Sequence, residues 1–369
     1  MRILHALLIS TALAGGGAQA QTTQTTPAGK ASVDQTGAVK MDPNAVADSD
    51  MKRVIDTLKS LNGKSIATLS AEEARKQPTP ADAVKALLSK DGKSASPDAG
   101  VTTKDITYDG PGGALKARIY TPAGMEGKAL PVVLYLHGGG WVIANIDVYD
   151  ASPRALAKLT GAIFVSAEYR FAPEHKFPAA HDDAVAAYKW VLANARSFGG
   201  DPGRVALAGE SAGGNLALNV AIAARDQKFQ APLGMVLVYP VAGVDMDTKS
   251  YKDNAGAVPL NKAMMGWFFD KTVKSQADLA DPRLDLAGKA NLAGLPPAAV
   301  ITAEIDPLRT EGMLLAQKLK AAGVQVEARD YTGVTHEFFG MGAVVAKARQ
   351  AEEFAAAELK KYLASQAKN

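Results

Sequence analysis

The stretch that decides the fold runs from residue 205 to residue 214 and reads Val-Ala-Leu-Ala-Gly-Glu-Ser-Ala-Gly-Gly. Its first four residues are apolar and predict a buried strand, and the Leu, Ala and Val residues after Gly214 predict a helix. Between the two, Ser211 stands in a Gly-x-Ser-x-Gly pentapeptide. The glycines let the chain turn sharply and hold the serine hydroxyl at the carboxyl edge of a sheet. Such pentapeptides also arise by chance in loops, but the flanking strand and helix favour a nucleophilic serine.

This run is one of six apolar runs along the chain that have the length of buried strands. They lie at residues 132–136, 163–167, 205–208, 235–239, 298–302 and 324–329. Continuous apolar runs that alternate with helical patterns predict parallel strands buried on both faces. Two earlier segments, 106–108 and 117–120, flank a glycine-rich turn and predict an antiparallel pair. The fold class is therefore α/β, with a mostly parallel, doubly wound sheet.

The composition excludes several kinds of chemistry. Among 369 residues there is no cysteine, which removes thiol nucleophiles, cysteine-bound metals and disulfides. The five histidines form no His-x-x-x-His pair, so we expect no metal site and no cofactor. The net charge is +3 and the basic residues are scattered, so nothing indicates a nucleic-acid partner. The sequence leaves the oligomeric state, monomer or homodimer, open.

The first twenty residues have the pattern of an export signal. Arg2 precedes an apolar stretch at 3–13, and the small-x-small site at 18–20 predicts cleavage after Ala20. The stretch is shorter than the roughly 20 residues that span a bilayer, and no later apolar run is long enough. Residues 21–41 are rich in Gln, Thr, Ala and Gly and predict a disordered linker. We expect a periplasmic or secreted protein with no membrane span.

A helical region follows the linker. Asp42-Pro43 opens one predicted helix, which Gly63 closes. Ser70-x-x-Glu73 has the pattern of a capping box, and Thr79-Pro80 predicts the start of another short helix.

A second glycine-rich segment follows the predicted strand at 132–136 and reads His137-Gly138-Gly139-Gly140-Trp141. Successive glycines let backbone N–H groups approach an oxygen atom on which negative charge develops, as acyl transfer requires. A flexible turn and a phosphate-binding loop are the alternatives, but no phosphate-binding glycine motif follows. We interpret the segment as an oxyanion loop, shaped by His137.

A serine nucleophile on this fold needs an acid and then a histidine later in the chain. His336 is the only histidine after Ser211, so it is the expected base. Asp306 follows the strand at 298–302 and is the expected acid, although an Asp before a Pro is also a common helix cap. Three other acids are alternatives: Asp245, Asp247 and Glu304.

Several blocks together resemble the bacterial hormone-sensitive-lipase-like esterases, which are family IV of the lipolytic enzymes. These blocks are His-Gly-Gly-Gly-Trp at 137–141, residues 169–179, Gly-Glu-Ser-Ala-Gly-Gly at 209–214, Asp-Pro-Leu-Arg-x-Glu-Gly at 306–312 and His-Glu-Phe-Phe at 336–339. The resemblance covers roughly residues 100–365. It departs from the family at Glu210, where Asp is usual, and at Glu337, where Gly is frequent.

The resemblance implies an α/β-hydrolase fold and a serine carboxylesterase acting on short-chain acyl esters. It implies that Ser211 is the nucleophile, His336 the base and Asp306 the acid. The oxyanion donors would be the N–H groups of Gly139, Gly140 and Ala212, with Gly138 as a further candidate. Trp141 would contact the substrate.

The resemblance also divides the chain into parts. It implies an N-terminal helical cap segment at 42–95 and a catalytic domain at 100–369, with a cap insertion at about 243–290. An amidase or exopeptidase, a polysaccharide or aromatic-ester deacetylase, and a non-catalytic ligand-binding protein of this fold are the alternative functions.

Overall fold

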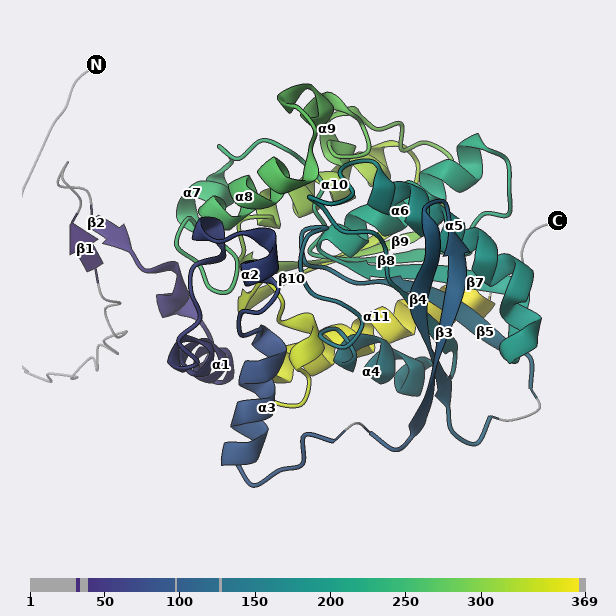
Figure 1. The fold of residues 1–369 in the computed structure, drawn as a ribbon, viewed down its shortest axis with the longest axis horizontal. Coiled ribbons are helices and arrows are strands. Elements are labelled where there is room, and N and C mark those ends of the chain that lie inside the picture. Colours follow the sequence, from purple (N-terminus) through teal and green to yellow (C-terminus); the bar gives the residue numbers. More distant parts are fainter. Residues whose placement is uncertain (1–30, 34–38, 97, 126–127, 365–369) are drawn as a thin grey trace, which may run out of the picture.

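The structure, a computed structural model, describes residues 31–33, 39–96, 98–125 and 128–364. Its centre is an eight-stranded sheet with the order β10-β9-β8-β7-β5-β6-β4-β3 (Figure 1). The strands are β3 (Val101–Gly110), β4 (Gly113–Pro122), β5 (Leu130–Leu136), β6 (Ile163–Ala167), β7 (Gly200–Glu210), β8 (Met235–Val238), β9 (Ala298–Ile305) and β10 (Val326–Thr335). The six strands from β5 to β10 pair in parallel, whereas β4 is antiparallel to both β3 and β6. The predicted α/β fold class and the early antiparallel pair are therefore confirmed.

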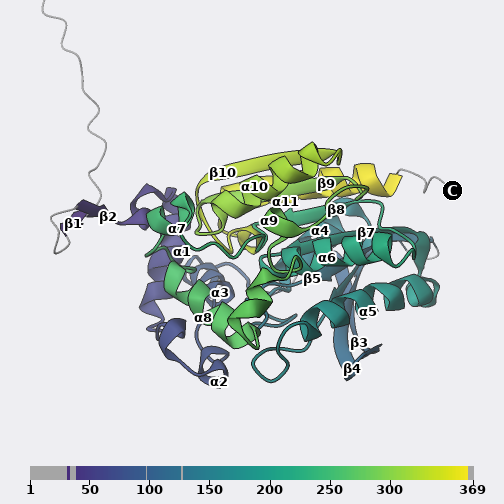
Figure 2. The ribbon, with the colours of Figure 1, turned by 90° about the horizontal axis from the view of Figure 1, so that it is seen from above.

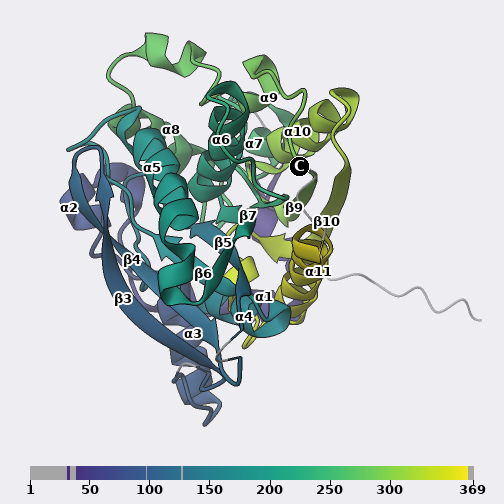
Figure 3. The same ribbon diagram turned by 90° about the vertical axis from the view of Figure 1, so that its right-hand side faces the viewer.

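Helices cover both faces of the sheet, which explains the long apolar runs of its inner strands. The main helices are α4 (Ala151–Thr160), α5 (Ala179–Asn194), α6 (Ala212–Asp226), α10 (Arg309–Ala321) and α11 (Ala346–Ala364). On β5, Leu134 and Leu136 pack into the core shared with α5 and α6, while Val133 and Tyr135 pack into the core shared with α4 and α11. Successive side chains of a strand point to opposite faces, so a strand between two helical layers buries every residue. Figure 3 shows the two helical layers on either side of the strands.

Two helical segments, far apart in the sequence, lie side by side at one end of the molecule (Figure 2). The first contains η1 (Pro43–Val46), α1 (Ser49–Ser60), η2 (Ile66–Thr68), α2 (Ala71–Ala74) and α3 (Pro80–Lys90). The second follows β8 and contains α7 (Lys249–Asp253), α8 (Lys262–Thr272), η4 (Gln276–Ala280) and α9 (Leu286–Lys289). The indole N–H of Trp267 donates to the Leu69 carbonyl at 2.9 Å and joins the two segments.

The predicted helix starts have a mixed outcome in the first segment. Ser70 and Thr79 begin α2 and α3 with complete capping boxes. The single helix expected from Asp42 to Gly63 is wrong, because the chain forms the short η1 and then α1. The interruption is local: Ala47 has an extended backbone, with ψ 138°, that a helix cannot include.

The predicted export signal at 1–20 lies outside the described residues. Within the predicted linker, the described residues form two short antiparallel strands, β1 (Ala31–Val33) and β2 (Val39–Met41). Among the described residues, no helix combines the length and apolar character that crossing a membrane requires.

Candidate active site

Ser211 lies in the sharp turn between β7 and α6, as the pentapeptide predicts. Its backbone has φ 56° and ψ −120°, a conformation that costs a non-glycine residue free energy and that surrounding contacts must hold. A Cβ atom at Gly213 would lie 1.9 Å from the Leu136 carbonyl oxygen, and one at Gly209 would lie 2.2 Å from the Gly213 carbonyl oxygen. Both glycines are therefore required by close backbone packing, and together they fix where the serine hydroxyl stands.

The structure brings Ser211, His336 and Asp306 into one hydrogen-bonded series. His336 follows β10, and its Nε2 lies 3.0 Å from the Ser211 Oγ. Its Nδ1 lies 2.7 Å from the Asp306 Oδ2, and Asp306 follows the adjacent strand β9. The other oxygen of Asp306 accepts the backbone N–H of Leu308 at 2.8 Å. Asp306 therefore acts as a local cap and also contacts the histidine, so the two interpretations of this residue are compatible.

The alternative acids lie elsewhere. Asp245 and Asp247 are exposed, and Asp247 pairs with Lys262 at 2.9 Å. Glu304 accepts the backbone N–H of Gly333 at 2.7 Å. None of these three carboxylates contacts His336.

Charges around His336 decide its protonation. Burial of the imidazole opposes its charged form, but Asp306 favours it through charge and a hydrogen bond, and Glu337 and Glu210 add negative charge. The net effect raises the pKa of His336 above its ordinary value. The imidazole therefore sits in a pocket that stabilises imidazolium, the form it takes after it accepts a proton from a serine.

The glycine loop after β5 has an unusual backbone conformation and carries unpaired N–H groups in the described structure. Gly139 has φ 100° and Gly140 has φ 59°, which L side chains rarely adopt. Within the described residues, the N–H groups of Gly138, Gly139, Gly140 and Ala212 have no hydrogen-bond acceptor. A Cβ atom at Gly140 would lie 2.3 Å from the Phe268 ring of α8, so the second helical segment packs directly on this loop. Unpartnered donors on a held loop are what an oxyanion site requires.

The side chains of Arg75 and His137 hold this loop. Arg75, which ends α2, donates to the Val142 and Ala172 carbonyls at 2.8 and 2.9 Å and forms an ion pair with Glu174. Buried His137 contacts the Gly138 carbonyl through Nδ1 at 2.7 Å. Its role in shaping the loop agrees with the sequence interpretation, and Arg75 is a support that the sequence did not indicate.

Trp141 differs from its expected place on a substrate surface. Its side chain is 1% exposed, and the indole stacks on His181 with ring centroids 6.0 Å apart. The turn at Trp141, with φ 60°, directs the ring into the core beneath the loop. The indole therefore supports the loop from below, which corrects the substrate-contact assignment.

A cluster of buried carboxyl groups beside His336 was not predicted. Glu210 precedes Ser211 and accepts hydrogen bonds from the hydroxyls of Tyr135 and Tyr239. The Glu337 Oε1 accepts the Tyr149 hydroxyl at 2.5 Å and lies 3.8 Å from the His336 Nε2. The signal was present in the sequence: Glu337 stands where the resembling family often has glycine, and its φ of 69° is a glycine-like conformation. Among the described residues, no group of three or more His, Asp or Glu side chains is placed to hold a metal ion.

A strained serine at the carboxyl edge of a mostly parallel sheet, facing a histidine and a free glycine loop, defines an α/β-hydrolase. A family model described as the alpha/beta hydrolase fold matches residues 133–340. The chain is 39% identical over 271 residues to carboxylesterase NlhH of Mycobacterium tuberculosis, covering 72% of this chain and 84% of that protein. It is 34% identical over 289 residues to an ethyl acetate hydrolase of Pseudomonas putida, covering 76% of this chain and 86% of that one.

Solved structures of ester hydrolases are also similar to this chain. A hyperthermophilic esterase from Pyrobaculum calidifontis superimposes with a TM-score of 0.76 at 37% identity, covering 85% of this chain and 98% of the other. An ester hydrolase from the Lake Arreo metagenome, in complex with a bipyridine phosphonate derivative, gives 0.77 at 34% identity, with 86% and 100% covered. The chain belongs to the hormone-sensitive-lipase-like family of α/β-hydrolases, and it is a carboxylic ester hydrolase.

Proposed function

We propose that this protein is an exported serine carboxylesterase that hydrolyses short-chain acyl esters through a covalent acyl-enzyme. The observation that carries the proposal is the hydrogen-bonded series of Ser211, His336 and Asp306, with distances of 3.0 and 2.7 Å. The free N–H groups of the glycine loop support it, because acyl transfer needs donors where the carbonyl oxygen becomes negative.

In the proposed acylation step, the Ser211 Oγ attacks the ester carbonyl carbon while the His336 Nε2 accepts the hydroxyl proton. Asp306 keeps the other proton of the ring on Nδ1, so that Nε2 is free to accept, and it stabilises the imidazolium that results. The N–H groups of Gly139, Gly140 and Ala212, with Gly138 as a further donor, receive the oxyanion. Each such donor contributes about 3 to 4 kcal/mol to lowering the barrier.

Collapse of the tetrahedral intermediate expels the alcohol, which takes the proton from His336. The acyl group remains on Ser211 as an ester. A water molecule then attacks this ester, with His336 as its base, and releases the carboxylic acid and the free serine.

Replacing the proposed nucleophile tests this function. We expect Ser211→Ala to abolish hydrolysis of p-nitrophenyl acetate and labelling by a fluorophosphonate probe, while circular dichroism shows a folded protein. Ser166→Ala is the matched control, because this serine is also buried but lies on β6. Hydrolysis that persists undiminished in Ser211→Ala would overturn the proposal.

The preference for short acyl chains is supported by the relative named ethyl acetate hydrolase, together with Phe268, which packs directly on the glycine loop. A series of p-nitrophenyl esters from acetate to palmitate tests it, with the highest kcat/KM expected at the short end. Matched ester and anilide substrates separate an esterase from an amidase.

Export is supported by the pattern of residues 1–20. Fractionation of expressing cells, followed by N-terminal sequencing, should find a mature chain that begins at Gln21 outside the cytoplasm. An uncleaved chain in the cytoplasm would contradict export.

A further inference from the structure

The strand that leads to His336 contains a bulge. β10 pairs regularly with β9 as far as Tyr331, and the pairing resumes only at Thr335. The four steps between these two residues lie opposite two steps of β9, from residue 303 to residue 305. We call residues 332–334 the β10 bulge. A bulge bends its strand and changes the direction of the side chains that follow, so this one sets where the imidazole stands.

Both backbone polar groups of Gly333, in the middle of the β10 bulge, form hydrogen bonds outside the pairing of β9 with β10. Its N–H donates to the Oε2 of Glu304, a side chain of β9, at 2.7 Å. Its carbonyl accepts the backbone N–H of Asp48, the residue before α1, at 2.8 Å. Gly333 is buried, and a buried N–H that loses its acceptor costs free energy. The Glu304 carboxylate therefore stabilises the conformation of the bulge.

A lysine of α11 contacts another residue of the bulge. The Lys347 ammonium donates to the Thr332 carbonyl at 2.8 Å and forms an ion pair with the Asp48 carboxylate at 2.7 Å. Its side chain is 29% exposed, so the ion pair itself contributes little to stability. Residues from β9, from the start of α1 and from α11 thus meet at the bulge.

We propose that Glu304 is a positioning residue for the proposed base, because it holds the β10 bulge in the conformation that lets His336 meet Asp306 and Ser211 together. The imidazole has two contacts to keep at once, 2.7 Å from Nδ1 to the Asp306 Oδ2 and 3.0 Å from Nε2 to the Ser211 Oγ. A bulge that relaxes would move the ring relative to both partners. This inference rests on the proposed esterase function and adds a residue that supports its base through the backbone.

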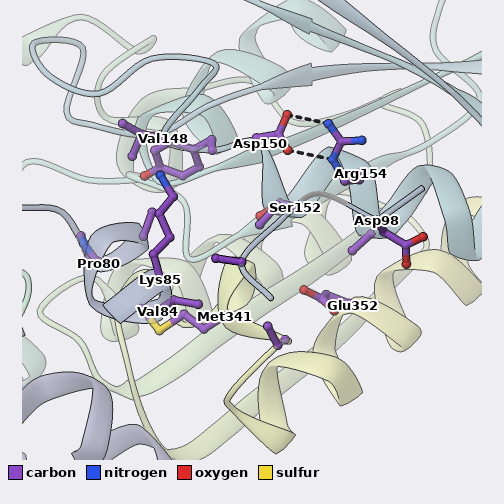
Figure 4. Close-up of a pocket in the computed structure, with 18 of the residues that line it drawn as sticks. Pro80, Val84, Lys85, Asp98, Val148, Asp150, Ser152, Arg154, Met341 and Glu352 are labelled. Atoms are coloured by element: carbon purple, nitrogen blue, oxygen red, sulfur yellow. Dashed lines mark hydrogen bonds and ion pairs between the residues drawn. The ribbon is translucent and has the colours of Figure 1, made fainter. Parts of the chain in front are cut away.

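The groups that act directly on His336 are different from Glu304. Titratable groups beside the imidazole include Asp306, Glu210, Glu337 and Tyr239. Glu210 and Glu337 line a cavity of about 970 Å³ between α3, α4 and the start of α11 (Figure 4). Glu304 does not belong to the described residues that line this cavity. Replacing it therefore leaves the direct neighbours of the base in place.

Two replacements of Glu304 separate its hydrogen bond from its charge, because glutamine keeps an oxygen that accepts the Gly333 N–H. We expect Glu304→Ala to lower kcat for p-nitrophenyl acetate about tenfold with little change in KM, since a displaced base slows the chemical step more than binding. The acid limb of kcat/KM against pH should also move to lower pH, because a weaker contact with Asp306 lowers the pKa of His336. Glu304→Gln should keep the kcat and the acid limb of the unaltered protein.

Asp330→Ala is the matched control. Asp330 lies on β10 before the bulge, and its carboxylate accepts the Thr302 hydroxyl of β9 at 2.8 Å. This replacement therefore removes a carboxylate that links the same two strands but does not contact the bulge. We expect it to lower the free energy of unfolding in urea while kcat and the acid limb stay unchanged.

Should Glu304→Ala fail to fold, Lys347→Met carries the comparison, because this side chain is partly exposed. Loss of a cation alone would raise the pKa of His336 and move the acid limb to higher pH. Release of the bulge should instead lower kcat and move the limb to lower pH. A limb of Lys347→Met that stays in place or moves to higher pH overturns the inference.

Three results with the Glu304 variants would also overturn it. These are a folded Glu304→Ala with unchanged kcat and acid limb, equal losses in Glu304→Ala and Glu304→Gln, and an equal shift of the limb in Asp330→Ala. The proposed function has its own outcome in the same assay. Hydrolysis that persists in Ser211→Ala refutes the proposed function, whereas an inactive Ser211→Ala beside an unchanged Glu304→Ala refutes only the positioning role.

Discussion

Replacing Phe268 with alanine tests whether the helical segment at 249–289 holds the glycine loop in place. Phe268 belongs to α8, and its side chain is 3% exposed. The ring lies against the backbone of Gly140, where an added Cβ atom would be 2.3 Å from a ring carbon. The same ring therefore serves two purposes: it attaches α8 to the catalytic domain, and it limits the movement of a proposed oxyanion donor.

The size of the effect follows from the buried area. A phenylalanine buries roughly 150–250 Å², which at about 25 cal/mol per Å² stabilises by about 4–6 kcal/mol. Alanine keeps the Cβ atom, so we expect Phe268→Ala to lower the free energy of unfolding by about 3–5 kcal/mol. A displacement of about 1 Å at a reacting group typically costs about 10²-fold, so kcat should fall by a factor of that order.

Urea denaturation measures the stability change, and initial rates with p-nitrophenyl acetate measure kcat and KM. Phe354→Ala is the control, because Phe354 is also buried but lies on α11 in the core on the opposite face of the sheet. It should lose similar stability and keep its kcat. A Phe268→Ala variant that loses stability but keeps kcat would show that the ring does not position the loop.

Three further outcomes are expected. Asp306→Asn should lower kcat about 10⁴-fold, because the amide favours the wrong imidazole tautomer, whereas Asp245→Asn should leave kcat within twofold. Equal losses of kcat in the two variants would place the acid elsewhere. The acid limb of kcat/KM against pH should lie above the ordinary histidine pKa, because the base must be neutral to accept a proton and nearby carboxylates raise the pKa of His336. Glu337→Gln removes one of these negative charges and should move the limb to lower pH. A limb that does not move would contradict the assignment of His336 as the base. Trp141→Phe should lower the free energy of unfolding by less than about 1.5 kcal/mol and leave the acyl-length preference unchanged, because the indole is buried beneath the loop and its N–H has no partner among the described residues. An altered length preference would show that Trp141 contacts the substrate.

Sequence patterns predicted the parts of this fold that depend on local geometry. Apolar runs located the strands because a strand covered on both faces buries side chains on both sides and is therefore mostly apolar. A capping-box pattern located the start of α2, and Thr79-Pro80 located the start of α3; in both, a side chain satisfies one of the first free N–H groups. The helix expected from Asp42 was wrong because one extended residue, Ala47, is enough to end it, and the apolar pattern continued past that point.

The acid of the candidate site depended on which strands are neighbours. Asp306 and the alternative acids all lie in or after predicted strands, so their place in the sequence did not separate them. The pairing of β9 with β10 places Asp306 beside His336, and Glu304 instead meets the backbone of Gly333. Strand order is a long-range property, and the residues around one acid carry little information about it.

The grouping of carboxyl groups beside the site also depends on long-range packing. Glu210 is far in the sequence from Glu337 and Glu352, and charged residues are ordinarily expected at the surface. They come together only because α11 packs against α4 beside the serine turn.

The sequence by itself determined the residues that we propose as nucleophile and base. A strand, a Gly-x-Ser-x-Gly turn and a helix occupy one short stretch, and a single histidine follows it. The tertiary structure decided which acid contacts that histidine, what holds the glycine loop and which charges surround the site. The physical reason is that a turn is defined by neighbours along the chain, whereas a charge cluster and a cavity are defined by elements that meet only when the sheet and its helices pack.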